Sequence, residues 1–277
     1  MLTASPIITL LISLVGLLVG GLLNMLADDL PQRSRVRAPH YPDMHPRPPA
    51  AWLGVLAFLL GRRKSPGGAT LSWRHPVTEV ATAFLMGVAY QVGATHQNMT
   101  ALQMGFWLIY MAMFVLITVI DLEHRLILFV VIIPSWGIAL LDALTTEYGA
   151  TLQEALLGAV FGFGVFFVLY LGGFAFTRVM GALQNREVNE VAFGYGDVML
   201  ITLSGLILGW RPLILAMFIT VFLGALGAIL YLVARRLLSR EGYQWFTPLP
   251  YGQYIIIATA IMLLFATQVT GALIGTR

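Results

Sequence analysis

The sequence of 277 residues contains no cysteine and few charged residues. The absence of cysteine excludes disulfide bonds and thiolate metal sites. Only 10% of the residues are charged and 58% are hydrophobic, whereas a soluble domain has about 25% charged residues. Because the apolar residues come in long runs, this composition excludes an ordinary globular core and predicts an all-α integral membrane protein. The sequence also has no internal repeat and no nucleotide-binding motif.

Eight apolar segments are each about long enough to cross a hydrocarbon core of roughly 30 Å. They cover residues 5–27, 76–93, 102–120, 126–144, 152–179, 197–209, 212–234 and 251–274. The first has no basic stretch before it and no small-x-small cleavage site, so we interpret it as a retained helix and not as a signal peptide. The sixth is short, and we expect it to extend to Trp210, with Arg211 and Pro212 forming a tight turn into the seventh.

These segments predict three parts of the chain. Residues 1–27 form the first transmembrane helix, residues 28–75 form a loop rich in proline and arginine, and residues 76–277 form a seven-helix core. Within the loop, the apolar piece 50–60 is too short to span a membrane. We expect it either to lie in the membrane interface or to pack under the helices.

Basic residues are concentrated on one side of the predicted membrane. Fourteen of the sixteen Lys and Arg residues lie in four segments on the same side: eight in the 28–75 loop, Arg125 after the third span, two before the sixth span and three before the eighth. The other side has Arg211 and Arg277. Because Lys and Arg are enriched in cytoplasmic loops, the 28–75 loop is expected in the cytoplasm and both termini outside. One miscounted helix would place these basic residues on both sides of the membrane. Their concentration on one side therefore supports the count of eight spans.

Two aspartates border the predicted membrane. Asp197 follows Gly194 and Gly196, which permit a tight turn before the sixth span, and Asp121 ends the third span. Each has a structural explanation: Asp is a good helix N-cap, and Asp121 can pair with Arg125 four residues later. However, the two spans run in opposite directions, which brings both carboxylates to the same face and depth, where ionisable groups are costly and usually functional.

A pair of close carboxylates predicts a particular chemistry. Two such groups do not both ionise easily, so they share a proton. One can then activate a water molecule as a general base while the other protonates the substrate as a general acid. This is aspartic-protease chemistry, and it needs neither a metal nor a cofactor.

Five segments share their order and character with one known family. They are LLVGGLLNMLADDLP at 17–31, LSWRHPVTEVATAFL at 71–85, IDLEHRLI at 120–127, GYGD at 194–197 and PLPYGQYI at 248–255. Together they resemble the type IV prepilin peptidase family, which are membrane aspartic proteases with a GxGD motif. The resemblance extends over nearly the whole chain.

The resemblance implies an enzyme of the bacterial inner membrane that removes basic leader peptides from prepilins or pseudopilins. The cut falls at the cytoplasmic membrane face, just before an apolar helix. Asp121 and Asp197 would be the catalytic residues, and Gly194 and Gly196 would form the active-site loop. Many members also methylate the new N-terminus with S-adenosylmethionine. The expected partners are the substrate and membrane lipid, without nucleic acid.

The sequence departs from the family in the first loop. The family often has two CxxC motifs that bind zinc, and their positions correspond here to Tyr41 and Met44 in HYPDMHP and to Lys64 and Gly67 in RRKSPGG. Zinc is therefore not expected, because structural sites need a tetrahedral set of N and S ligands. The histidines that could replace the thiolates in principle are His40, His45 and His75.

Further departures concern methylation. The usual Pro-Asp after the first aspartate is Leu128-Phe129, and Met199 stands where the family often has Lys. These changes leave the proteolytic pair in place and leave methylation open. Two roles are open for Glu79 and Asn24: they either stabilise helix ends or contact the substrate amine or the methyl donor.

Two other classes of function compete with the protease. An ion-coupled transporter would use the aspartate pair to bind cations or protons, but it predicts carboxylates near the bilayer midplane and inverted repeats. A catalytically inactive relative would act as an assembly subunit. The loss of the zinc-loop cysteines and the presence of Met199 keep this alternative open.

Overall fold

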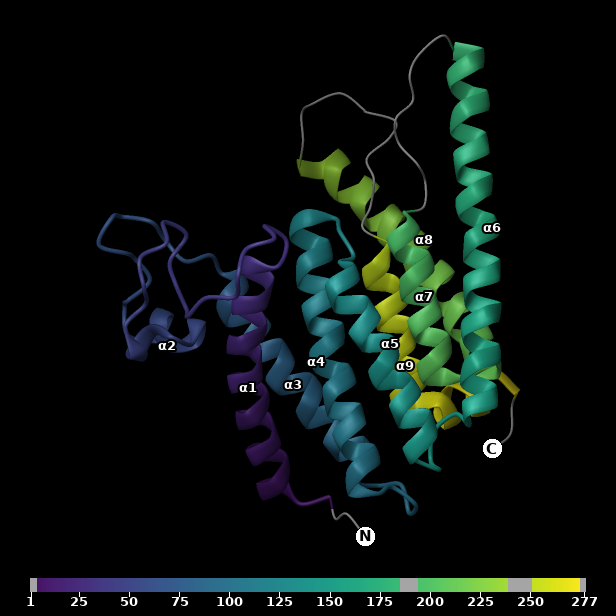
Figure 1. The fold of residues 1–277 in the computed structure, drawn as a ribbon, viewed down its shortest axis with the longest axis horizontal. Coiled ribbons are helices and arrows are strands. Elements are labelled where there is room, and N and C mark those ends of the chain that lie inside the picture. Colours follow the sequence, from purple (N-terminus) through teal and green to yellow (C-terminus); the bar gives the residue numbers. More distant parts are fainter. Residues whose placement is uncertain (1–3, 185–193, 239–250, 275–277) are drawn as a thin grey trace. The chain divides into compact units, whose positions relative to one another are not determined.

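The computed structural model describes residues 4–184, 194–238 and 251–274, and within these ranges it is helical with no strand. The elements are α1 (Pro6–Asp29), η1 (Pro49–Ala51), α2 (Gly54–Leu59), α3 (Arg74–Gly93), α4 (Ala101–His124), α5 (Phe129–Thr145), α6 (Leu152–Gln184), α7 (Tyr195–Leu208), α8 (Trp210–Leu238) and α9 (Gly252–Ile274) (Figure 1). The prediction of an all-α protein is confirmed. Each of the eight apolar segments overlaps one of the helices α1 and α3 to α9.

The helices fit a multi-pass membrane protein. Among the described residues, α1, α4 and most of α6, α8 and α9 are long and apolar enough to cross a membrane, and α5 and α7 are shorter apolar helices. The α3 helix has 20 residues and begins with polar residues that are buried in the protein, including His75 and Glu79. Of the basic residues counted above, Arg186, Arg240 and Arg277 lie outside the described part of the chain.

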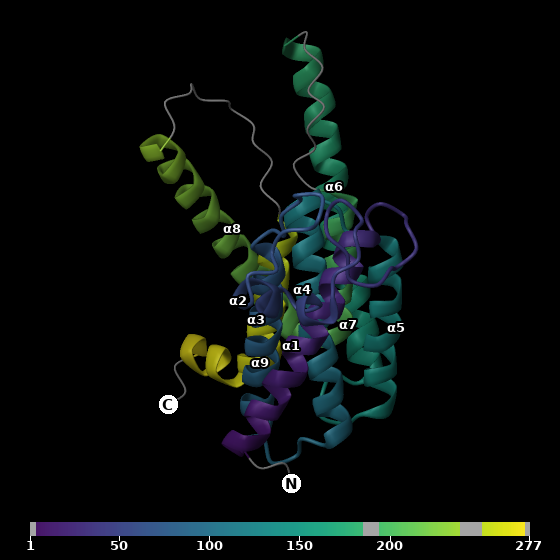
Figure 2. The same ribbon diagram turned by 90° about the vertical axis from the view of Figure 1, so that its left-hand side faces the viewer.

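The chain divides into two compact units, residues 1–126 and 127–277. In the first unit, α1 and α3 pack along each other and α4 packs against both (Figure 2). Gly16 and Gly20 allow this close packing, because a Cβ atom at Gly20 would be 2.5 Å from the Cα of Glu79 and one at Gly16 would be 2.8 Å from the Cα of Ala83. Small residues four apart are a common interface between membrane helices.

The 28–75 loop forms a small folded part of the first unit. Tyr41, Ala51, Ala57 and Leu71 make an apolar cluster, with Phe58 packed against it. The Tyr41 hydroxyl donates to the carbonyl of Arg62 at 2.8 Å, which connects the two halves of the loop. The apolar piece 50–60 forms η1 and α2, and α2 packs against α3.

In the second unit, α7 is the central helix and contacts α5, α6, α8 and α9. Its residues from Val198 to Leu208 are all buried. The α6 and α7 backbones meet at Gly158 and Gly205, where a Cβ atom on either glycine would overlap the other backbone. Gly209 has a φ of 75° and ends α7, so α8 begins at Trp210. The expected extension of the sixth span to Trp210, with a tight turn at Arg211 and Pro212, is therefore wrong. The positive φ of Gly209 ends α7 earlier, and Arg211 and Pro212 lie in the first turn of α8.

Candidate active site

Asp121 lies in the last turn of α4, in the first unit. The backbone N–H of Arg125 donates to the Asp121 carbonyl at 2.8 Å, and Arg125 ends the helix with a left-handed φ of 54°. The Asp121 side chain is buried, and its Oδ2 has no hydrogen-bond partner among the described residues. Buried polar atoms are nearly always paired, and a catalytic role is one of the explanations for a carboxylate oxygen that has no partner among the described residues.

Asp197 lies in the first turn of α7, in the second unit. The helix begins at Tyr195, two residues earlier than the apolar pattern indicates, and Gly194 is its N-cap. The Gly194 N–H donates to Asp197 Oδ2 at 3.1 Å, so the carboxylate helps to hold the turn. Gly196 packs against Ile127, and a Cβ atom there would be 2.9 Å from the Ile127 Cβ. A side chain at position 196 would thus push the GYGD turn away from Ile127.

Aromatic rings surround the beginning of α7. Tyr195 stacks against Phe129 with ring centroids 6.4 Å apart and meets Tyr170 edge-on at 5.9 Å. Phe129 belongs to the Leu128-Phe129 pair that replaces the family's Pro-Asp. The replacement therefore supplies an apolar contact for the GYGD turn. Met199, which stands at the family's Lys position, is 3% exposed, and its carbonyl accepts from Trp136 Nε1 at 3.2 Å.

Glu79 and Asn24 are both buried in the first unit. Glu79 Oε1 accepts from the Gly54 N–H at 2.5 Å, and Oε2 accepts from the Val55 N–H at 2.8 Å. The Asn24 amide donates to Glu79 Oε1 at 3.2 Å and to the carbonyl of His75 at 2.9 Å. These contacts satisfy the first N–H groups of α2, which have no partner within the helix itself. For both residues, these contacts support the role of stabilising helix ends rather than that of contacting the substrate amine or the methyl donor.

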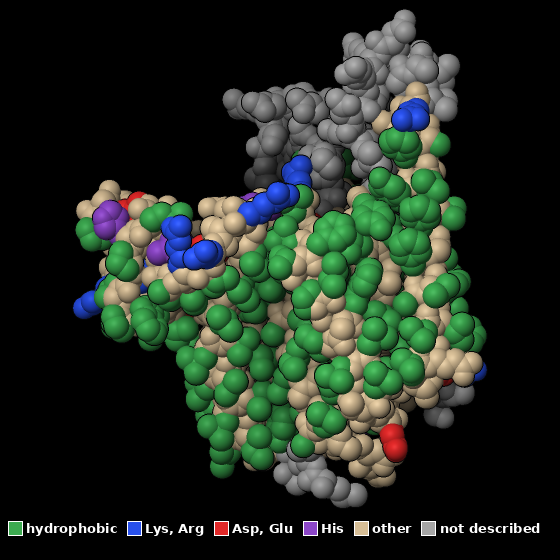
Figure 3. Space-filling view, viewed as in Figure 1, with side chains coloured by type: hydrophobic (Ala, Val, Ile, Leu, Met, Phe, Trp, Pro, Cys, Tyr) green, Lys and Arg blue, Asp and Glu red, His purple; other side chains and the backbone are tan. Residues whose placement is uncertain are grey.

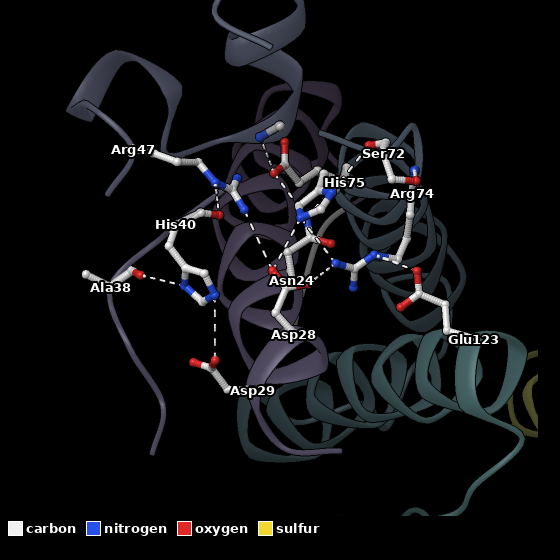
Figure 4. A network of polar contacts seen from close by, with 12 residues as sticks. Asn24, Asp28, Asp29, Ala38, His40, Arg47, Ser72, Arg74, His75 and Glu123 are labelled. Atoms are coloured by element: carbon white, nitrogen blue, oxygen red, sulfur yellow. Dashed lines mark hydrogen bonds and ion pairs between the residues drawn. The ribbon is translucent and has the colours of Figure 1, made fainter. Parts of the chain in front are cut away.

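An ion network joins the ends of α1, α3 and α4 (Figure 4). Arg74 pairs with Asp28 on one side, and its Nε lies 3.0 Å from Glu123 Oε1 on the other. The Asp28 carboxylate also accepts contacts from His75 at 3.3 Å and Arg47 at 3.7 Å. Burial lowers the pKa of the Arg47 guanidinium, and the Asp28 carboxylate opposes this shift. Because Glu123 is two residues after Asp121, the network fixes the end of α4 that carries the candidate catalytic residue.

This network was not predicted from the sequence. There, Arg74 counts only as one positive charge in the loop, and Asp28 and Glu123 have no assigned role. The sequence shows that opposite charges lie near the ends of predicted helices, and such charges pair when the helix ends adjoin. Which charges pair could be found only after the packing of α1, α3 and α4 was known.

The loop brings together the two positions that hold CxxC motifs in the family. Each is a tight turn: the Met44 N–H donates to the Tyr41 carbonyl at 2.9 Å, and the Gly68 N–H donates to the Ser65 carbonyl at 3.0 Å. The Ser65 hydroxyl donates to Asp43 and lowers the pKa of that carboxyl. A hydrogen bond between side chains therefore connects the turns that two pairs of thiolates would connect through zinc.

The nearby histidines are separate from one another. Each pairs with a different aspartate: His40 with Asp29 at 3.8 Å, His45 with Asp43 at 3.1 Å and His75 with Asp28 at 3.3 Å. The described residues contain no group of three His, Cys, Asp or Glu side chains that could hold a metal ion. The donor set in this loop therefore does not fit a structural zinc site.

Comparisons with known proteins agree on one family. The family model that matches residues 108–229 describes the type IV leader peptidase family. A prepilin leader peptidase/N-methyltransferase of Pseudomonas aeruginosa is 31% identical, and the alignment covers 93% of this chain and 90% of the relative. The protein of the same name from Stutzerimonas stutzeri is 29% identical over 98% of this chain and 96% of its own. One from Bacillus subtilis is 25% identical over 80% and 78%. No solved structure matches the chain.

Proposed function

The chain belongs to the type IV leader peptidase family, and we propose that it is an aspartic endopeptidase that removes leader peptides from prepilin-like or pseudopilin substrates. One observation carries this proposal. The GYGD turn and the IDLEHRLI turn each place a carboxylate at a helix end, and both Asp121 and Asp197 lie within the matched residues 108–229. The GYGD motif at residues 194–197 alone would be weak support. A relative that is 31% identical over 93% of this chain is strong support.

The two aspartates would divide the work of one proton-sharing pair. The ionised carboxylate takes a proton from water as the water oxygen attacks the scissile carbonyl carbon. The protonated carboxyl donates its proton to the carbonyl oxygen, and the tetrahedral species that results then breaks its C–N bond as the leaving amine gains a proton. Every proton in this sequence comes from water or from the two carboxyls, so no metal or cofactor is needed.

We propose that the active site faces the cytoplasm and that the protein lies in the bacterial inner membrane. Fourteen of the sixteen basic residues support this orientation. The two aspartates would then act at the membrane border where a substrate helix emerges, with its basic leader in the cytoplasm. The scissile backbone must be extended, which favours a Gly before the cut.

Methylation of the new N-terminus is a second, separate activity. The printed names of the relatives include N-methyltransferase, and S-adenosylmethionine would be the methyl donor. The buried Met199 gives this position an apolar side chain in the helix core, without the charge that the family often has there. We propose that proteolysis is retained regardless of methylation, because neither catalytic carboxylate is affected.

The direct test uses the purified protein in lipid vesicles and a synthetic substrate. The substrate has a basic leader, a Gly and an apolar run of about 20 residues, the length that spans a bilayer. Mass spectrometry should find a cut directly after the Gly, and a substrate with Val in its place should stay intact. Adding S-adenosylmethionine reports methylation in the same spectrum. An intact Gly substrate would instead support an inactive assembly subunit.

A further inference from the structure

The residue before the short helix α2 contacts the apolar part of α1, and α2 itself packs against α3. Leu53, which directly precedes α2, packs against Gly21, where a Cβ atom would be 2.6 Å from the Leu53 Cδ2. Gly21 is eight residues before the end of α1 at Asp29, which corresponds to about 12 Å along a helix. Gly54 packs in the same way against His75 and Pro76 of α3. In Figure 1, α2 lies at the height of the upper part of α1 and not beyond the end of that helix.

The outer side of α2 is apolar and open. Ala57 faces the loop cluster, whereas Leu56 is 39% exposed and Leu59 is 76% exposed. We call this surface the loop patch. It consists of Trp52, Leu56, Leu59, Leu60 and Trp73.

The loop patch continues into the lipid-facing side of α3. Trp73 precedes the helix and is followed at helical spacing by Val77, Val80 and Phe84, each of which is more than half exposed. Positions 73, 77, 80 and 84 share one face of a helix. In a multi-pass protein this apolar face meets acyl chains, so the loop patch is the extension of a lipid-contacting surface.

Basic residues border the loop patch directly. Arg62 and Lys64 follow α2 and are exposed, and Arg63 lies over the Phe58 and Trp73 rings at 4.8 and 5.8 Å. Figure 3 shows hydrophobic and basic side chains next to each other on the part that the loop forms, at the left of the view. Aromatic and apolar side chains flanked by Arg and Lys are the composition of helices that lie in the membrane interface.

We propose that the loop patch is immersed in the bilayer at the boundary between head groups and acyl chains, with Arg62 and Lys64 on the phosphates of anionic phospholipids. The role of Glu79 follows from this. The N–H groups that begin a helix must find partners when the helix lies away from bulk water, and the Glu79 carboxylate supplies them for Gly54 and Val55. If this side is cytoplasmic, as proposed above, the anionic lipids are those of the inner leaflet.

The test places a nitroxide spin label on a single cysteine in this cysteine-free chain. Leu59→Cys reports the loop patch, Val80→Cys on α3 is the lipid-facing control, and Pro66→Cys in the exposed turn is the water-facing control. Collision rates with oxygen and with a water-soluble nickel chelate are measured in vesicles of phosphatidylcholine, with and without phosphatidylglycerol. The readout is independent of cleavage, so a protein that fails to cleave still answers the question.

The label at position 59 should resemble the label at position 80, with oxygen collisions exceeding nickel collisions, and the label at position 66 should show the reverse. Phosphatidylglycerol should increase the ratio of oxygen collisions to nickel collisions at position 59. The double substitution Arg62→Gln and Lys64→Gln should abolish that increase. A water-like label at position 59, or one shielded from both reagents, would overturn immersion. An equal ratio in both lipids would overturn the role of anionic head groups.

Discussion

Glu79 accepts hydrogen bonds on both of its carboxylate oxygens. It is fully buried, and three N–H donors from α1 and from the beginning of α2 contact its two oxygens. Hydrogen bonds to charged groups stabilise more than neutral ones, and their loss leaves buried N–H groups without partners. This side chain of α3 thus connects the beginning of α2 to both α1 and α3.

We predict that Glu79→Ala lowers the free energy of unfolding by about 2–4 kcal/mol, since it leaves Gly54 and Val55 N–H groups unpaired and opens a cavity. The measurement is thermal unfolding in detergent, together with the rate of proteolysis in the 28–75 loop. The control is Glu147→Ala, since Glu147 is exposed in the turn between α5 and α6. Equal effects of the two variants would show that the contacts of Glu79 do not hold the loop.

Side-chain contacts connect the two turns of the loop that correspond to the family's CxxC motifs. The two turns that carry CxxC in the family are here joined by the hydrogen bond between Ser65 and Asp43 and by the cluster around Tyr41. We predict that metal chelators change neither the melting temperature nor the rate of cleavage. Stoichiometric zinc in washed protein, measured by elemental assay, would contradict this and would point to His40, His45 and His75.

The packing of α6 against α7 depends on direct contact between their backbones. We predict that Gly205→Ala destabilises the protein by at least about 2 kcal/mol, because the new Cβ atom would overlap the backbone of Gly158 and overpack the site. Gly172→Ala on α6 is the matched control, since nothing lies within 4 Å of its added Cβ atom. This control should be neutral or stabilising by up to about 1 kcal/mol, because Ala favours a helix over Gly. Thermal unfolding measures both, and a tolerated Gly205→Ala would exclude the close helix contact.

The sequence predicted the helices better than their contacts. Apolar runs located the helices α1 and α3 to α9, and the ordered motifs predicted the family, which the 31% identical relative confirms. Boundaries were less accurate where glycine decides them, as at Gly209, because a left-handed residue ends a helix without changing the hydrophobic pattern. The Glu79 contacts and the Arg74 network were not predicted, because they join residues that are far apart in the sequence.

The orientation that we propose for the whole chain rests on its charge distribution, and single cysteines can test it. We predict that Lys64→Cys is labelled by an impermeant thiol reagent only after the inner face is exposed, whereas Thr276→Cys is labelled from outside. Residue 276 lies outside the described part of the chain, so this prediction rests on the count of spans alone. The opposite pattern of labelling would place Asp121 and Asp197 on the outer side.

The central claim is that Asp121 and Asp197 act as one catalytic pair. We therefore propose to measure cleavage of the leader–Gly–apolar substrate by Asp121→Asn and by Asp197→Asn, each with Asp142→Asn as the control on the opposite side of the predicted membrane. Asparagine keeps the shape of the side chain but neither holds nor donates the shared proton. Each of the two variants should insert, keep its melting temperature within a few degrees and lose cleavage by at least about a thousandfold, as expected when a member of a catalytic unit is removed. Cleavage near the wild-type rate by either variant would contradict the pair.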